Sequence, residues 1–158
     1  AGMGCSPQRT MLLERAFEAF LEKQAGSLVA GEVASLLKVF KVPLPIFHPG
    51  GMQLLASEAE VRAALEALMA SYRRIGVRDV SGSLEEYATK PASDTVGCLM
   101  LFKYLGADRT ELRRTRARYF LEPVGGSYRI VMLEYDQAAF PEIFPEFCNV
   151  IPLPTAKD

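Results

Sequence analysis

Apolar residues in the first part of the chain recur every three or four positions, the spacing of an amphipathic helix. This spacing runs from Met11 to Gly31, with charged residues between the apolar ones, and predicts the first helix. A break at Gly26 is the alternative, because glycine destabilises a helix by about 1 kcal/mol. Two further helices are expected, over residues 32–40 and 57–76.

Local signals mark where the third helix begins and ends and what precedes it. Ser57 and Glu60 have the spacing of a capping box, and Gly76 is a natural C-terminal stop. Residues 42–48 are expected to form an extended edge segment, because their prolines cannot donate ladder hydrogen bonds. Residues 52–56 are expected to return as a short strand after a Pro-Gly-Gly turn.

The second half of the chain changes from the helical period to the alternation of β-strands. Turn-forming residues divide it into four expected strands, over residues 79–90, 95–105, 110–123 and 127–137. Helices followed by a meander of long strands are typical of an α+β fold. We therefore expect a curved antiparallel sheet, wrapped by about three N-terminal helices, that encloses a mostly apolar pocket.

The chain has 158 residues, which fits one domain of ordinary size. Residues 1–9 are expected to be a loose N-terminus, with a native start at Met3, and residues 10–137 the folded domain. Residues 138–158 form a tail rich in proline and phenylalanine, which we expect to pack on the body or on a partner.

Composition and charge exclude several classes of protein. Apolar residues make up 49% and charged residues 23%, the balance of a globular chain rather than a disordered one. A formal net charge of -1 argues against a nucleic-acid surface, although it is compatible with a local basic stripe. The sequence contains no apolar run of membrane-spanning length and no secretory signal. We expect a cytoplasmic protein that contacts neither nucleic acid nor membrane.

The cysteine, histidine and glycine patterns predict no metal and no cofactor. Cys5, Cys98 and Cys148 are far apart and odd in number, as expected for free thiols in a reducing compartment. Because His48 is the single histidine, a Cys/His zinc site has too few ligands. The glycine pairs match turns rather than phosphate-binding loops.

Several short motifs accompany this order of elements. They are Phe17-Glu-Ala-Phe20, the Gly-Glu pair at residues 31–32, Pro45-Ile-Phe-His-Pro49, Arg118-Tyr-Phe-Leu121 and Gly125-Gly-Ser-Tyr-Arg-Ile130. Together, over residues 11–135, they resemble the nuclear transport factor 2-like superfamily, and within it the SnoaL-like branch of small bacterial domains. The resemblance implies a cone-like fold with a pocket between sheet and helices, and often a homodimer. It implies no single function, because this fold hosts isomerases, dehydratases, hydrolases, cyclases and non-catalytic modules.

Alternation along the strands predicts which side chains face the pocket. The arginine-bearing face of residues 114–122 is expected to point outward, because burying three unpaired arginines would be costly. A two-residue turn at Gly125-Gly126 then pairs Ala117 with Glu134, and a similar turn is expected at Ala107-Asp108. A one-residue bulge at the second turn would invert the inward face. The expected pocket residues are Tyr104, Tyr119, Thr115, Phe102, Met100, Cys98, Leu121, Met132 and Ile130.

Polar groups gather at one end of this expected pocket. Glu134 and Asp136 share a strand face, so either is a candidate general base whose pKa burial would raise, or a solvated partner of nearby arginines. His48 is a candidate acid or base, or else the exposed end of its strand. Tyr104 and Tyr119 are candidates to donate to a ligand oxygen or to backbone carbonyls of the core.

Other residues favour a structural interpretation. Cys98 is expected to be a buried, inert thiol, because no histidine is predicted near it. The arginines of residues 113–118 are expected to form a salt-bridged surface with Glu85 and Glu86. The outward face is also expected to carry four apolar residues, Leu99, Leu101, Val131 and Leu133. That face is too apolar for free solvent, which predicts a covered or dimeric face.

Two functions follow from these expectations. The first is a SnoaL-like pocket that binds a small apolar molecule, with isomerase-, cyclase- or dehydratase-like chemistry at Glu134 or Asp136 and a tyrosine that steadies an oxyanion. The second is a non-catalytic homodimerisation or protein-interaction module that uses the outer sheet face and the tail. A closed cavity with both carboxylates outside it would exclude the enzyme.

Overall fold

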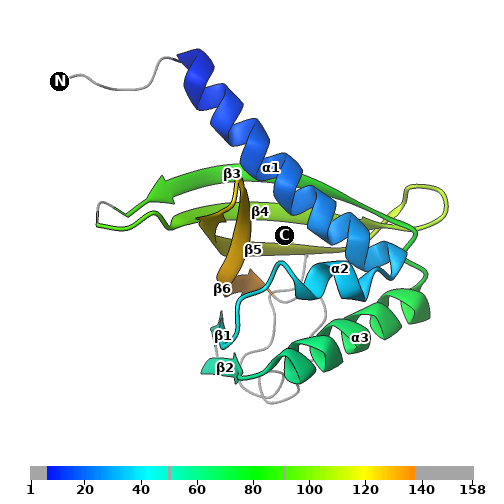
Figure 1. Cartoon of the computed structure of the whole chain (residues 1–158). Helices are drawn as coiled ribbons and strands as arrows, with labels where there is room; N and C mark the ends of the chain where they lie inside the picture. The colour runs from blue at the N-terminus through cyan, green and yellow to red at the C-terminus, as the bar shows by residue number, and fades with distance from the viewer. Residues whose placement is uncertain (1–6, 50, 91, 138–158) are drawn as a thin grey trace.

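A computed structural model describes residues 7–49, 51–90 and 92–137 of the chain. Helices dominate its first half and long strands its second half, as Figure 1 shows. The expectations for residues 1–6 and for the tail at 138–158 lie outside the described residues.

The three predicted helices are present. They are α1 (Pro7–Ala30), α2 (Val33–Leu37) and α3 (Glu58–Ile75). The first begins inside the segment predicted to be loose and continues through Gly26, so the alternative of a break there is wrong. The second is shorter than predicted, because the residues after it leave the helix to pair with a strand: a β-bridge joins Phe40 to Ile130.

The third helix has the predicted ends. The backbone N–H of Glu60 donates to the Ser57 hydroxyl at 3.3 Å, and the Glu60 carboxylate accepts from the N–H of Ala56 at 3.0 Å. Gly76 ends the helix with a left-handed φ of 87°. The sequence therefore specifies both ends of α3 through contacts within a few residues.

Six strands form one sheet in the order β2-β1-β6-β5-β4-β3. They are β1 (Leu44–His48), β2 (Gly51–Leu55), β3 (Asp79–Thr89), β4 (Val96–Leu105), β5 (Glu111–Val124) and β6 (Ser127–Gln137). Neighbours are antiparallel except β1 and β6, which are parallel. Since β1 lies between β2 and β6, the prediction that it is an edge segment is wrong.

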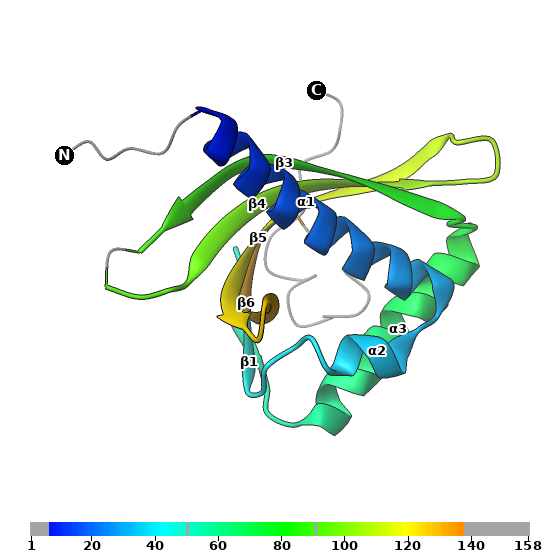
Figure 2. The same cartoon turned by 45° about the horizontal axis from the view of Figure 1, so that its top comes forward.

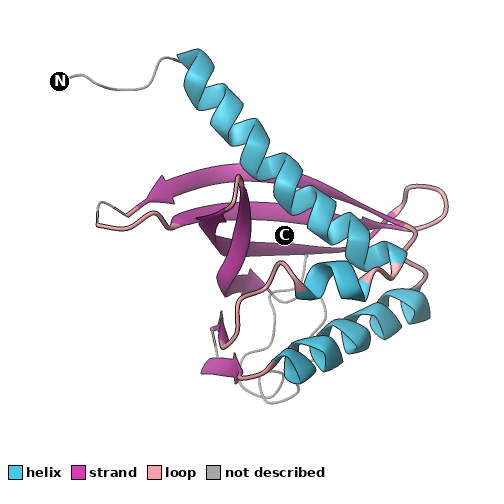
Figure 3. Ribbon diagram, viewed as in Figure 1, coloured by secondary structure: helices cyan, strands magenta, loops and turns pink. Residues whose placement is uncertain are grey.

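The sheet is curved, and the helices cover its concave side. In Figures 1 and 2, α1 runs across β3 and β4, while α2 and α3 close the end near β1. Figure 3 shows the same separation of helices from strands by colour. This arrangement confirms the predicted α+β fold and leaves an interior between the two layers.

Glutamates of α1 hold this helix against the edge strand β3. The backbone N–H groups of Leu84 and Gly82 donate to the carboxylates of Glu18 and Glu22, at 2.8 and 3.0 Å. An unpaired strand edge is a template for aggregation, and these carboxylates satisfy part of it. Gly82 also leaves room for the ring of Phe102, because a Cβ at Gly82 would lie 2.6 Å from that ring.

The outer face of the sheet carries the predicted ion pairs. Arg116 Nε lies 2.7 Å from Glu85 Oε1, and Arg118 Nη2 lies 3.1 Å from Glu86 Oε2. A shift in register after Leu84 lets these consecutive glutamates both reach the outer face. The interpretation of the arginines as a salt-bridged surface is therefore confirmed.

The predicted pairing of β5 with β6 holds only next to the turn. Leu121 pairs with Ile130 as expected, but a bulge follows, and Ala117 pairs with Tyr135 instead of Glu134. One extra residue reverses the faces of a strand, so the predicted inward Glu134 is wrong.

The same bulge exchanges other residues of β6 between the two faces. Met132 lies opposite Phe120 on the outer face, whereas Leu133, predicted to be outward, is buried. The physical reason for the bulge is burial: it places Leu133 and Tyr135 inside and leaves Glu134 in solvent.

The inward face of β4 is as predicted, although its pairing with β5 is not. The loop is longer than two residues, since Leu105 pairs with Glu111, and a further shift pairs Tyr104 with Arg113. Together the shifts amount to two residues, which preserves the face. Cys98, Met100, Phe102 and Tyr104 are accordingly all buried.

Candidate functional site

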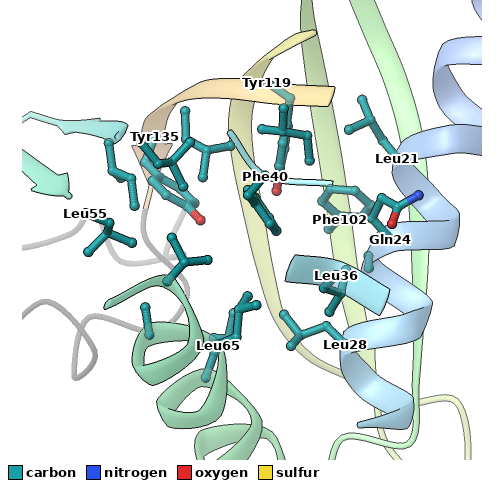
Figure 4. Close-up of a pocket in the computed structure, with 18 of the residues that line it drawn as sticks. Leu21, Gln24, Leu28, Leu36, Phe40, Leu55, Leu65, Phe102, Tyr119 and Tyr135 are labelled. Carbon is teal, nitrogen blue, oxygen red and sulfur yellow. The ribbon is translucent and has the colours of Figure 1, made fainter. Parts of the chain in front are cut away.

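A cavity of about 90 Å³ lies between the helices and the concave side of the sheet. Figure 4 shows its walls, which come from all three helices and from every strand of the sheet except β3. Fifteen of its twenty described lining residues are aliphatic or phenylalanine, among them Leu21, Leu28, Leu65 and Phe102. One water needs on the order of 10–15 Å³ of cavity, so this space accommodates several waters or one compact apolar group.

The other lining residues are Gln24 and four tyrosines, Tyr72, Tyr104, Tyr119 and Tyr135. None of the described lining residues carries a charge at neutral pH. Burying an uncompensated charge against such walls would cost on the order of several kcal/mol, because the ion would lose its hydration. The part of any ligand that enters the cavity must therefore be neutral.

Two of the tyrosines form a hydrogen-bonded pair. The rings of Tyr72 on α3 and Tyr104 on β4 have centroids 5.3 Å apart, and their hydroxyls are hydrogen-bonded to each other. The hydroxyl of Thr115, buried behind them, also bonds to Tyr104. These contacts fix one end of the cavity and tie α3 to the sheet.

The other two tyrosines point their hydroxyls into the cavity, as Figure 4 shows for Tyr119 and Tyr135. The ring of Tyr119 packs edge-on against Phe102, with centroids 5.8 Å apart. Both tyrosines are half-buried, and both line the cavity. Neither hydroxyl makes a hydrogen bond to any residue within the described ranges. They are the polar groups most available to a ligand.

Burial raises the pKa of all four tyrosines, because the charged phenolate would lose its hydration. For Tyr104, the hydrogen bonds from Tyr72 and Thr115 partly offset this increase in the pKa. For Tyr119, the nearby Tyr135 adds to it. At neutral pH these hydroxyls are thus neutral groups that donate and accept hydrogen bonds.

The structure places the predicted pocket residues in three groups. Tyr104, Tyr119, Phe102 and Ile130 line the cavity. Thr115, Met100, Cys98 and Leu121 face the same side of the sheet but are buried in the core away from the cavity. Met132 lies on the outer face, where the bulge in β6 puts it.

Two of the three predicted catalytic residues, Glu134 and His48, do not line the cavity. Glu134 is exposed on the outer face opposite Arg118. Asp136 belongs to β6, and its side chain lies outside the described part of the chain. His48 is buried at the end of β1 rather than exposed, and burial lowers the pKa of its imidazole. It does not line the cavity.

Sequence reasoning missed Tyr135, Tyr72 and Gln24 as cavity residues. Tyr135 was hidden by the bulge, because simple alternation placed it on the outer face. Tyr72 lies in the last turn of α3, where its ring contacts that of Tyr104. Its position on the same helical face as Val61 and Leu65 is the signal that it points inward.

The described residues contain no group of three histidine, cysteine or acidic side chains that could hold a metal ion. Of the described helices, none is long and apolar enough to cross a membrane.

A curved sheet wrapped by helices around an apolar cavity defines an NTF2-like protein. The family model described as "NTF2-like protein (DUF6841)" matches residues 11–137, and the chain belongs to this family. The predicted resemblance to the nuclear transport factor 2-like superfamily is therefore confirmed. No curated protein matches the chain.

Solved structures share the fold at low sequence identity. Aln2 from a Streptomyces species is 16% identical with a TM-score of 0.59, over 83% of this chain and 91% of that one. A domain of unknown function with a cystatin-like fold from Nostoc punctiforme is 13% identical with a TM-score of 0.57, over 91% and 88%. An NTF-2 like protein of unknown function from Silicibacter pomeroyi is 15% identical with a TM-score of 0.55, over 83% and 98%.

Proposed function

We propose that this domain binds a compact, mainly apolar small molecule in its cavity. The observation that carries the proposal is an apolar cavity into which the hydroxyls of Tyr119 and Tyr135 point without a partner among the described residues. Such hydroxyls recover a hydrogen bond when a ligand oxygen lies between them. A neutral ring or short chain with one carbonyl or hydroxyl group has the matching chemistry.

The same geometry favours binding over the acid–base chemistry considered from the sequence. Glu134 is exposed to solvent on the outer face, so it cannot reach a ligand in the cavity. At neutral pH the tyrosines of the cavity stay protonated, because burial raises their pKa, so they present no phenolate that could act as a base. A general base must come within hydrogen-bond reach of the proton that it removes. The described residues of the cavity offer donors and acceptors instead.

Binding can be tested by NMR titration with cyclohexanone and with methylcyclohexane, which has a similar shape but no oxygen. We expect cyclohexanone to shift resonances of cavity residues, and Tyr119→Phe/Tyr135→Phe to weaken its binding by about fivefold, the value of one net hydrogen bond. Binding of methylcyclohexane should not weaken. Tyr128→Phe is the control, because Tyr128 packs against Phe17 and Phe20 outside the cavity. Equal effects of both variants on cyclohexanone would contradict the proposal.

We propose homodimerisation through the outer sheet face as a second function, supported by exposed apolar residues on the β1–β2 hairpin. Phe47 pairs with Met52 and Pro45 with Leu54, so their side chains form one continuous patch. Phe47, Met52 and Leu54 are 39%, 51% and 47% exposed. Contiguous apolar surface of this kind marks interaction sites in soluble proteins.

The oligomeric state of the full chain tests this second function. Sedimentation velocity between about 1 and 200 µM should show a concentration-dependent dimer, and Phe47→Glu should make the chain monomeric, because a charge would be buried at the interface. Leu12→Glu, at a 68% exposed position of α1, is the matched control. A monomer mass for the wild type at every concentration would contradict homodimerisation.

A further inference from the structure

Basic grooves lie directly beside the apolar cavity. One groove, of about 410 Å³, runs between α1, the end of α2 and the turn from β5 to β6, and shares Gln24 with the cavity. A second groove, of about 640 Å³, shares Phe40 with the cavity. Lys38 and Arg129 line both grooves, so they lie where the two grooves meet.

A short β-bridge explains why cations and the cavity wall are neighbours. The backbone N–H of Ile130 donates to the Val39 carbonyl at 2.8 Å, and that of Lys41 to the Ile130 carbonyl at 2.9 Å. The bridge joins Phe40 to Ile130, and both side chains line the cavity. Arg129 is adjacent to Ile130, and side chains of an extended segment alternate between faces. The bridge therefore places apolar side chains inside and the cation on the groove side.

The first groove carries an excess of positive charge. Its described lining contains the cations Lys23, Lys38 and Arg129 and one carboxylate, Glu32, an excess of two positive charges. The carboxylate of Glu122, opposite Arg129 in the sheet, lies outside this lining and forms an ion pair with Lys41. The whole chain has a formal net charge of -1, so this excess is local. None of the three cations forms an ion pair with another described residue. The hydroxyls of Ser27, Ser35 and Ser127 also line the groove.

We propose that the ligand is an amphipathic carboxylate. Its apolar body, with the carbonyl or hydroxyl oxygen that meets Tyr119 and Tyr135, lies in the cavity, and its carboxylate lies in the first groove beside Lys38 and Arg129. This proposal rests on the proposed small-molecule binding and adds the class of ligand. The cavity requires a neutral body, whereas the groove offers a guanidinium that matches a planar carboxylate, and an ammonium. The two regions meet at Gln24, whose amide donates to the Phe20 carbonyl at 3.2 Å and so lies back along α1.

Calorimetric titration with hexanoate, hexanamide and acetate tests this assignment. Hexanoate and hexanamide have the same alkyl chain and differ in charge. Acetate has the carboxylate but lacks the long alkyl chain. At pH 7.5 and low salt, we expect hexanoate to bind about fivefold more tightly than hexanamide, the value of a partly exposed ion pair. Raising the NaCl concentration to about 300 mM should remove most of this preference, because salt screens exposed charges.

Lys38→Gln/Arg129→Gln should reduce the affinity for hexanoate to that for hexanamide and leave hexanamide binding unchanged. Arg78→Gln/Lys90→Gln removes the same charge away from both grooves and should keep the preference. Equal binding of hexanoate and hexanamide to the wild type would overturn the carboxylate assignment and leave the small-molecule site standing. Acetate binding as tight as hexanoate would also overturn it. If neither six-carbon probe binds, the carboxylate assignment fails, and the cyclohexanone titration decides separately whether the small-molecule site stands.

Discussion

The buried polar side chains of this domain are held in their neutral forms. Burial raises the pKa of Tyr119 and Tyr135 and raises the pKa of the Cys98 thiol to about 12, where the nearby Arg118 only partly opposes it. A neutral thiol is a poor nucleophile, and a neutral phenol is a poor base. At the scale of single residues, the interior therefore offers hydrogen bonds rather than charge or nucleophilic attack.

Two glycines should respond to the same substitution with opposite signs. Gly26 lies inside α1, while Gly76 ends α3 with a φ of 87°, and an added Cβ would meet no atom within 4 Å at either position. Gly76→Ala should lower the free energy of unfolding by about 1 kcal/mol, because side chains disfavour the left-handed region. Gly26→Ala should raise it by about 1 kcal/mol, because alanine favours a helix interior.

Urea unfolding followed by circular dichroism measures both changes, and each variant controls for the other because the same methyl group is added. Two shifts of the same sign would show that contacts, rather than backbone conformation, decide the outcome. The change for Gly26→Ala would also show how much the helical propensity of α1, which carries Gln24 and several other cavity residues, contributes to the free energy of unfolding.

At the scale of elements, the sequence predicts helices and turns because their causes are local. Ser57 and Glu60 satisfy the first turn of α3 from within four residues of each other, and Gly76 supplies the conformation that ends it. The turn at Gly125-Gly126 sets the pairing of Val124 with Ser127 directly. No distant contact is needed to specify these features, so the element types and most boundaries were predictable.

The faces of the strands were harder to predict, because in β6 apolar residues occupy both of the alternating sets of positions. Val131, Met132 and Leu133 are consecutive, so alternation alone does not say which of them is inside. The bulge after Leu121 is decided by packing in the shared core, which favours Leu133 and Tyr135 as inward residues. Alternation consequently assigned the candidate carboxylate of Glu134 to the wrong face.

The parallel pairing of β1 with β6 was also beyond local reasoning. The prolines of residues 42–48 suggested an edge strand. The pairing of β1 with β6 involves only Ile46 and Phe47, however, so Pro45 need not donate a hydrogen bond to β6. Strands distant in sequence meet there because their inward side chains share one core. The sequence consequently predicted the fold and four cavity residues, Phe102, Tyr104, Tyr119 and Ile130, but not Leu133 and Tyr135, which β6 also contributes to the wall.

At the scale of the whole molecule, one apolar interior joins the helices to the sheet. Residues from the described helices and from every strand of the sheet belong to a single buried cluster, which includes Phe17, Leu65 and Phe102. Tyr72 and Tyr104 connect α3 to β4 within it. Unfolding should therefore expose the tyrosines and Cys98 together, which links the stability of the molecule to their ionisation.

This linkage predicts that stability falls at alkaline pH. The pKa of Cys98 rises from 9.0 to about 12 on folding, and those of Tyr72, Tyr104, Tyr119 and Tyr135 rise from 10.0. The unfolded chain therefore loses these protons at lower pH than the folded chain. The stabilisation is fully present below about pH 9 and is lost as the pH rises toward the folded values.

Urea unfolding measured at intervals from about pH 7.5 to 11 should show a free energy of unfolding that declines steadily above about pH 9. Cys98→Ala should delay the start of the decline to about pH 10, where the tyrosines of the unfolded chain begin to ionise. Because the comparison concerns the shape of the pH dependence, a uniform loss of stability in this variant does not affect it. A free energy of unfolding that stays constant to pH 11 would mean that the tyrosines and Cys98 are not shielded from solvent by one common interior.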